Sequence, residues 1–235
     1  MRFEKRRHIT PDVLRHAIPV APFSSFMRWQ IVYGHVNHIL DVKLIDRPKY
    51  GPLFRFSDYH VYKTLSLLSD GRRKGRKQLA DRIGVGEGSM RTIVDYLRDE
   101  GYIDVKQTGV KITKKGQEYI VRLPLQLYTL DVQEMTLGQQ SVAVLVKGAS
   151  AKIGSGMEQR DNAIKAGADG ATTIIVRGDR LVVPVDYDLD KDQPDIAGEI
   201  RRLFDLNDGD VVIIGTSSDV QRAEEGALAA AFEII

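Results

Sequence analysis

The stretch of sequence that decides the fold of the first half is residues 78–93, QLADRIGVGEGSMRTI. It predicts a short helix over residues 78–83, in which the small Ala80 lets a second helix cross closely. Gly84 follows at a position where a left-handed backbone conformation suits glycine. After the glycine-rich turn, Ser89 can cap a second helix that runs to about residue 98. This second helix has an apolar face made of Met90, Ile93, Val94 and Leu97.

Regular elements flank this helix pair on both sides. Upstream, Val61, Leu65 and Leu68 recur at three- and four-residue spacing, which predicts a helix that Gly71 ends. Downstream, the sequence predicts strands over 102–106 and 110–113, joined by a tight turn, and a helix from residue 113.

This order of elements, three helices followed by a two-stranded wing, resembles the winged helix-turn-helix of prokaryotic regulators over residues 53–123. The resemblance implies that the third helix enters the major groove of double-stranded DNA. Its N-terminal and outward residues would then contact bases, and they are Ser89, Arg91, Thr92 and Tyr96. Arg91 is the best base-reading residue among them, because a guanidinium can bond both acceptors of a guanine edge.

Basic side chains around the motif are predicted to neutralise the phosphates of DNA. They lie in the loop before the second helix, on the wing and just after it, and they are Arg72, Arg73, Lys74, Arg76, Lys77, Lys106, Lys111, Lys114 and Lys115.

The charge of the chain is distributed unevenly. In total, 34 Lys and Arg stand against 32 Asp and Glu, a net charge of +2. Residues 1–123 hold 24 basic and 13 acidic residues, a net of +11, and residues 124–235 hold 10 and 19, a net of −9. A basic half joined to an acidic half lets one half meet phosphates while the other does not. A chance drift of charge between two domains is the alternative.

Two carboxylates and the length of the wing favour a different partner. Glu87 and Asp95 lie on or near the predicted recognition surface, where they repel phosphate, and a short wing turn reaches less far. Winged helices also serve as protein-interaction modules. The alternative function is therefore a non-enzymatic adaptor that uses the winged helix for protein–protein contact.

Residues 1–52 are predicted to form an N-terminal arm and a helix. Apolar residues recur at three- and four-residue spacing over residues 24–41, around the single Trp29. Packing of this helix against a second copy gives a homodimer, and packing on its own domain is the alternative. His35 and His38 are three residues apart, but no third ligand of a suitable type lies near them, so no metal site is predicted.

After a linker over residues 124–140, residues 141–235 are predicted to form a β-α-β-β-α-β module with one added helix. The predicted strands are 141–147, 171–177, 180–185 and 210–214, and the predicted helices are 157–166, 196–204 and 220–230. This order matches a ferredoxin-like fold, so the whole chain is predicted to belong to the α+β class. An open parallel α/β sheet is the alternative, and the hairpin turn at Gly178-Asp179 argues against it.

A glycine-bearing loop and the helix start after it form the predicted ligand site. Glycines allow close approach of the backbone, a helix start offers free N–H groups, and two basic side chains add charge. A small anionic effector, such as a phosphate or carboxylate, is therefore a predicted partner. A flexible loop beside a solvated helix face is the alternative. The residues of the predicted site are Lys152, Gly154, Ser155, Gly156, Glu158, Gln159, Arg160 and Asp161.

The acidic loop over residues 186–192 reads DYDLDKD. Alternating carboxylates suit a hard cation such as calcium. An EF-hand, however, needs a glycine and a glutamate where this chain has Lys191 and Ala197. The sequence therefore favours a solvated acidic loop.

Composition excludes several classes of protein. The chain has no cysteine, which excludes disulfide scaffolds, thiolate zinc sites and thiol catalysis. No apolar run approaches the roughly 18 residues of a membrane span, and no apolar stretch of a secretory signal follows the basic N-terminus. We therefore expect a cytoplasmic protein with no membrane partner. No nucleophile-and-base set stands out, so neither an enzymatic activity nor a cofactor is predicted.

Two segments carry a second resemblance. Residues 154–161 together with residues 167–173, GADGATT, resemble archaeal winged-helix proteins of unknown function whose C-terminal half is a domain of unknown function. The chain is thus predicted to be a DNA-binding transcriptional regulator. Its acidic half would assemble a homodimer or sense a small ligand.

Overall fold

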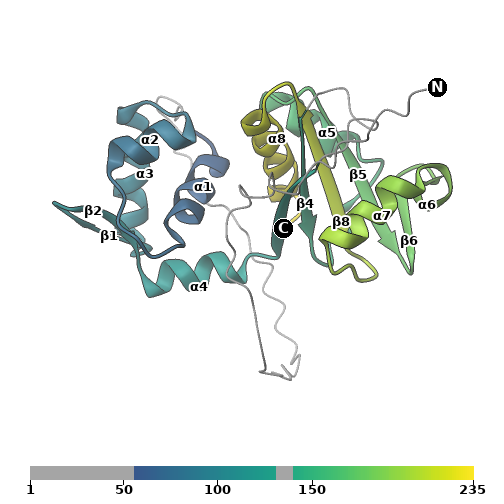
Figure 1. Cartoon of the computed structure of the whole chain (residues 1–235), viewed down its shortest axis with the longest axis horizontal. Coiled ribbons are helices and arrows are strands. Elements are labelled where there is room, and N and C mark those ends of the chain that lie inside the picture. Colours follow the sequence, from purple (N-terminus) through teal and green to yellow (C-terminus); the bar gives the residue numbers. More distant parts are fainter. Residues whose placement is uncertain (1–55, 131–139) are drawn as a thin grey trace, which may run out of the picture. The chain divides into compact units, whose positions relative to one another are not determined.

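The computed structural model describes residues 56–130 and 140–235 (Figure 1). These residues belong to one compact unit, Leu40–Ile235. The predicted N-terminal arm and helix, with Trp29, His35 and His38, lie outside the described residues, as do residues 131–139 of the predicted linker.

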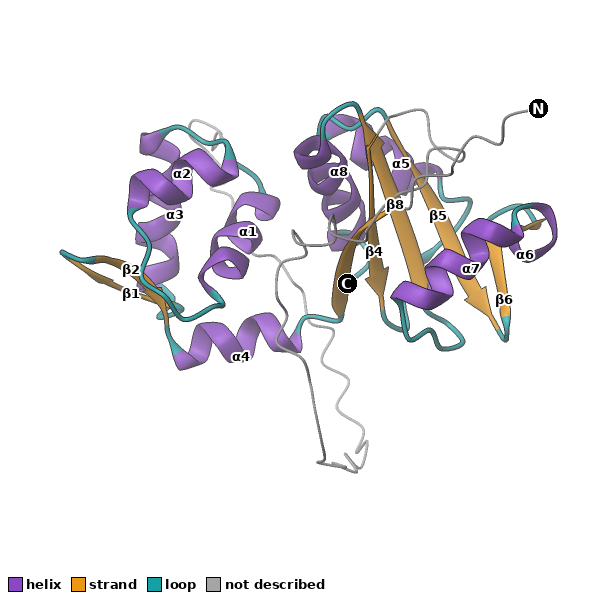
Figure 2. Ribbon diagram, in the orientation of Figure 1, coloured by secondary structure: helices purple, strands orange, loops and turns teal. Residues whose placement is uncertain are grey.

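The first described region contains three helices, a hairpin and a fourth helix (Figure 2). Its elements are α1 (Asp58–Leu68), α2 (Arg76–Ile83), α3 (Glu87–Asp99), β1 (Ile103–Lys106), β2 (Gly109–Ile112) and α4 (Lys114–Arg122). This is the order of elements that the sequence predicts.

One apolar core holds these elements together. Leu65 of α1, Leu79 of α2 and Ile93 of α3 are completely buried in it. The turn between α2 and α3 begins at Gly84, whose φ of +77° is a left-handed conformation that suits glycine. An isolated β-bridge between Lys74 and Val110 ties the loop before α2 to the hairpin.

The second region is built on an antiparallel sheet of six strands in the order β3-β4-β8-β5-β6-β7. The strands are β3 (Leu125–Leu130), β4 (Gln140–Val146), β5 (Gly170–Arg177), β6 (Arg180–Val183), β7 (Tyr187–Asp188) and β8 (Val211–Ser217). All seven residues of β8 are buried, which fits a strand at the centre of a sheet that is covered on both faces.

Helices cover both faces of this sheet (Figure 2). The helical segments are η1 (Ser150–Lys152), α5 (Met157–Lys165), α6 (Leu189–Asp192), α7 (Pro194–Leu203) and α8 (Val220–Phe232). Ala163 of α5 and Ala227 of α8 pack with Ile213 on one face. Ile200 of α7 packs with Val212 on the other. The region therefore has three layers.

The ferredoxin-like topology predicted from the sequence is wrong, although the β-α-β-β-α-β order of the main elements is present. A ferredoxin-like sheet has its first and third strands at the centre and both helices on one face. Here the four corresponding strands are ordered β4-β8-β5-β6, so the second and the fourth lie at the centre. The order of elements along the chain does not fix which strands pair, and β8, whose seven residues are all buried, takes a central place.

The predicted linker also differs from the structure. Residues 125–130 form β3, an edge strand that pairs with β4 from Leu125 opposite Val146 to Leu130 opposite Ser141. Leu125 and Leu127 are both partly buried against the α5 and α8 side of the sheet. Their two-residue spacing is the periodicity of a strand.

The helices of the described residues were compared with the length and hydropathy of a membrane span, and none of them has both.

Candidate functional site

The start of α3 presents polar side chains to solvent. Arg91 and Thr92 are exposed, and Ser89 is partly buried. The Thr92 hydroxyl donates a hydrogen bond to the Gly88 carbonyl oxygen at 3.2 Å. The Arg91 guanidinium has no salt-bridge partner among the described residues. The predicted apolar residues of the helix, Met90, Ile93, Val94 and Leu97, are all buried.

Tyr96 is not the outward residue that the sequence predicts. It is partly buried and packs against the same core as the apolar face of α3. It follows Ile93 by three residues, so it lies at the edge of the buried stripe rather than opposite it. The aromatic ring supports the helix from the side.

Two of the predicted phosphate-binding residues form internal contacts instead. Arg73 pairs with the Asp104 carboxylate and donates a hydrogen bond to the Gly109 carbonyl oxygen at 2.9 Å. Lys74 is buried, and its ammonium lies 2.6 Å from an Asp70 oxygen. Both side chains hold the loop before α2 in place, and Arg73 attaches this loop to the hairpin. We therefore assign them a structural role in place of the predicted phosphate contact.

Seven of the predicted phosphate-binding residues remain exposed. Within the described ranges, five of them have neither a salt bridge nor a side-chain hydrogen bond, and they are Arg72, Arg76, Lys77, Lys106 and Lys111. Lys114 has only a loose pair with Glu118 at 3.9 Å. Lys115 donates to the Glu100 carbonyl oxygen at 2.5 Å and lies over the Tyr102 ring.

The hairpin gathers charge on one of its faces. Lys111 lies opposite Asp104 in the register, and Lys106 lies two residues further along the strand from Asp104. Side chains at these positions point to the same face. The hydrogen bond from Arg73 holds the pKa of Asp104 below its ordinary value, and the two lysines add to that effect.

The two carboxylates that argued against DNA differ in their surroundings. Asp95 pairs with Arg98 at 2.9 Å, so its charge is partly neutralised. Glu87 is exposed in the first turn of α3. Of these two carboxylates, Glu87 is the one without a salt bridge in the described part of the chain.

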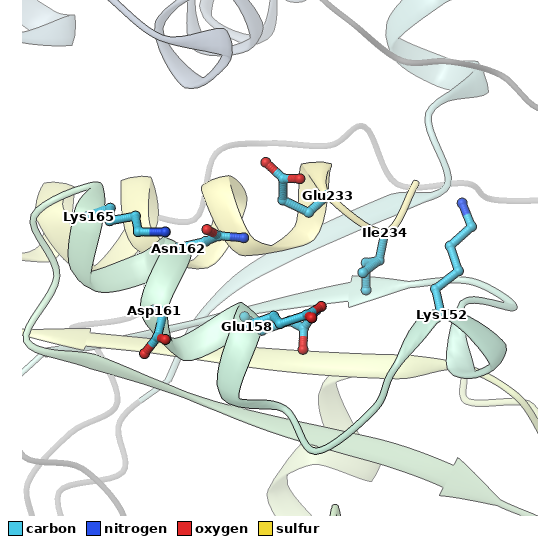
Figure 3. Close-up of a pocket in the computed structure, with 8 residues that line it drawn as sticks. Lys152, Glu158, Asp161, Asn162, Lys165, Glu233 and Ile234 are labelled. Carbon is cyan, nitrogen blue, oxygen red and sulfur yellow. The ribbon is translucent and has the colours of Figure 1, made fainter.

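The second region contains a pocket of about 350 Å³ (Figure 3). Its lining comes from η1, from one side of α5 and from the residues just after α8. The lining residues are Lys152, Glu158, Gln159, Asp161, Asn162, Lys165, Glu233 and Ile234.

The pocket contains half of the predicted ligand site. Lys152, Glu158, Gln159 and Asp161 line it. Gly154, Ser155, Gly156 and Arg160 do not; the Ser155 hydroxyl instead accepts from the Met157 N–H at 3.4 Å. Gly156 has a φ of +78° and lies before α5.

The sequence also missed half of the lining. Asn162 and Lys165 follow Glu158 by four and seven residues, so the helical period alone places them on the same side of α5. Glu233 and Ile234 are brought in by the packing of α8 beside α5. No local pattern in the sequence could have found those two.

The predicted acidic loop is folded into β7 and α6. Asp188 accepts from the Lys191 N–H and so caps α6. Asp190 pairs with Arg201 and accepts from the Leu181 N–H at 2.8 Å. The hydrogen bond from Arg201 lowers the pKa of Asp190. Among the described residues there is no group of three or more His, Asp or Glu residues arranged to hold a metal ion.

Side chains of α8 contact α1 through a cluster that the sequence did not indicate. Lys63 pairs with Glu224, and the Ser57 hydroxyl donates to Glu225 at 3.2 Å. Burial lowers the pKa of His60 and raises the pKa of Glu225, so both groups tend to the neutral form. The Ser57 N–H donates to His60 Nδ1 at 2.9 Å, which agrees with a neutral ring.

Two family models match separate parts of the chain. Residues 59–126 match the CggR N-terminal DNA binding domain. Residues 137–234 match a domain of unknown function, DUF4443. The first match covers the helices and hairpin whose exposed cations are described above, and the second covers β4 to α8, including the pocket. Comparison with curated proteins gives no match.

A solved structure decides the family. The hypothetical protein PH0730 from Pyrococcus horikoshii OT3 is 30% identical, over 74% of this chain and 91% of that chain, with a TM-score of 0.58. The chain belongs to the PH0730 family. An IcIR transcriptional regulator from Alicyclobacillus acidocaldarius also matches, at 12% identity over 74% of this chain and 95% of that chain. Its TM-score of 0.27 is too low to show a shared fold.

Proposed function

We propose that this PH0730-family protein is a transcriptional regulator that binds double-stranded DNA through a winged helix formed by α1, α2, α3, β1 and β2. In this proposal α3 enters the major groove and Arg91 contacts a base edge. The exposed Arg76 and Lys77 of α2 and Lys106 and Lys111 of the hairpin contact phosphates.

The observation that carries the proposal is the state of the cations around α3. Arg91, Arg76 and Lys77 are exposed, and within the described parts of the chain none of them has a salt-bridge partner. Arg73 and Lys74, by contrast, are paired inside the fold and are less available to phosphates. The match of residues 59–126 to a DNA-binding domain supports the same function.

The second region supplies regulation in this proposal. Its pocket would hold a small ligand with an anionic group, since Lys152 and Lys165 line it. Glu233 and Ile234 follow α8 directly, and α8 also contacts α1. A ligand in the pocket would thereby change the position of α8 and, through it, of α1 in the DNA-binding region. We further propose a homodimer, because helix-turn-helix proteins commonly bind two half-sites.

We propose no enzymatic activity for the chain. The second candidate function is a non-enzymatic adaptor that uses the winged helix for protein–protein contact. The exposed Glu87 in the first turn of α3 favours it, because a carboxylate there repels phosphate.

Binding to random-sequence duplex DNA over a salt series tests the proposal. We expect affinity to fall steeply as salt rises, because each neutralised phosphate contributes about −0.9 to the slope of log K against log salt. Replacing both Arg76 and Lys77 with alanine should reduce that slope. The matched control replaces Arg202 and Lys191, exposed cations of the second region, and should leave it unchanged. Absence of binding even at low salt would favour the adaptor.

A further inference from the structure

Four of the five charged residues that line the pocket are unpaired among the described residues. Lys152, Lys165, Glu158 and Glu233 have no salt bridge and no side-chain hydrogen bond within residues 56–130 and 140–235. The remaining charged lining residue, Asp161, has only a long contact of 3.5 Å to Arg160. A lining of opposite charges that do not pair with one another leaves both signs available to a ligand.

A buried amide in the same wall also has an unused hydrogen-bonding group. Gln159 is 2% exposed, and its Oε1 has no hydrogen-bond partner in the parts of the chain that the structure describes. A buried polar atom without a partner costs free energy that a bound donor can recover. The terminal torsion of glutamine is broad and roughly two-fold, so a flip of the amide can present either its oxygen or its nitrogen to a ligand. This is an independent sign that the pocket is built to receive a polar molecule.

The signs of the charges limit the class of ligand. Three lining carboxylates stand against two ammonium groups, so a simple anion meets more repulsion than attraction. A simple cation meets Lys152 and Lys165, which Figure 3 shows at opposite ends of the lining with Glu158 between them. A molecule that carries one charge of each sign satisfies both. Ile234 adds an apolar contact to the wall.

We propose that this pocket binds a free α-amino acid. Its ammonium group would lie against Glu158 and Glu233 and its carboxylate against Lys152, while Ile234 contacts its side chain. A pocket of about 350 Å³ has the size of a small-molecule site and is large enough for such a ligand. The regulatory meaning of this ligand rests on the proposed function, but the binding itself does not.

Thermal unfolding of the full-length protein, without DNA, tests the proposal. Each standard α-amino acid is added in turn at millimolar concentration, with inorganic phosphate as the anion-only probe and putrescine as the cation-only probe. We expect at least one amino acid to raise Tm in a saturable way, because a ligand that binds only the folded state stabilises it. Neither probe should do so.

Variants then locate the site by titration calorimetry with that amino acid. Glu158→Gln and Lys152→Met should each weaken binding by about tenfold to a hundredfold, since each removes a charge-assisted hydrogen bond. The matched controls, Glu199→Gln and Lys191→Met, lie outside the lining and should leave Kd unchanged. All four positions lie at least partly in solvent, so folding is checked simply by an unchanged Tm without ligand.

Three results would overturn the proposal. They are no shift with any amino acid, an equal shift with phosphate or putrescine alone, and a Kd that neither pocket variant changes. Because no DNA is present, each of these leaves the proposed DNA binding standing. Conversely, a protein that binds no DNA can still bind the amino acid.

Discussion

The chain has two loops whose charge indicates a binding site, and they differ in how many of their charged side chains pair within the fold. In the basic loop at residues 72–77, Arg73 and Lys74 are paired internally while Arg72, Arg76 and Lys77 stay exposed. In the acidic loop at residues 186–192, the first three carboxylates all have partners in the fold. Charge density in the sequence therefore identifies a charged segment but does not say which of its charges are available to a partner.

The largest expected change is a loss of stability when Asp190, the acidic-loop residue with the most contacts to the fold, is replaced. Asp190→Ala removes the partner of Arg201 and the acceptor of the Leu181 N–H. The free energy of unfolding in urea should fall by about 1.5–3 kcal/mol, the range for hydrogen bonds to charged groups. Asp192→Ala, in the same loop and without a side-chain partner among the described residues, should change it by less than about 0.5 kcal/mol. An equal loss of stability in both variants would show that carboxylates with and without partners in the fold contribute alike.

The next largest expected change is in DNA sequence preference when Arg91 of α3 is replaced. Arg91→Ala should reduce the preference for a selected operator over random duplex by about 1–3 kcal/mol, the usual value of a bidentate arginine–guanine contact. Competition binding at fixed salt measures it. Arg202→Ala is the control, because Arg202 is exposed on α7 and forms no salt bridge within the described residues. A loss of specific and random binding by the same factor would instead make Arg91 a phosphate contact.

Within the basic loop, Arg73 and Arg76 should behave in opposite ways. Arg73→Ala removes the pair with Asp104 and the bond to Gly109, so we expect a loss of stability of about 1 kcal/mol with an unchanged salt slope of DNA binding. Arg76→Ala should leave stability almost unchanged and lower the slope by about 1. Urea unfolding and salt-dependent binding of both variants decide the matter, and the reverse pattern would contradict the division of the loop.

The smallest effect is expected from calcium. Asp186, Asp188 and Asp190 already pair with Arg177, Arg180 and Arg201. Millimolar calcium should therefore raise Tm no more than the same concentration of magnesium. A specific rise with calcium that Asp188→Asn abolishes would show that the internal pairs yield to a cation.

Local patterns in the sequence were sufficient to predict most elements. The spacing of Leu65 and Leu68 in α1 and of Ile93 and Leu97 in α3 marks amphipathic helices, and these side chains are buried. Gly84 and its positive φ were foreseen from the position of a glycine after a short helix. Such features depend only on neighbours within a few residues, so one sequence reveals them.

Contacts between distant segments were not predictable in this way. The pairing of β8 between β4 and β5 and the pair of Arg73 with Asp104 both join residues far apart in the chain. For the same reason the residues of the predicted ligand site supply only part of the pocket lining. The loop and helix start supplied Lys152 and Glu158, but the opposite wall comes from Glu233 and Ile234.

Gly215, in the middle of β8, has a consequence for finding distant members of the PH0730 family. A Cβ at this position would overlap the backbone of α8 at Ala223 and Ala227, and a Cβ at Gly226 would overlap Ala168. The layer of α8 can thus lie on the sheet only when these positions carry the smallest side chains. Glycine within the last strand, followed eleven and twelve residues later by glycine and alanine, is a spacing by which sequences too divergent for overall alignment can be searched.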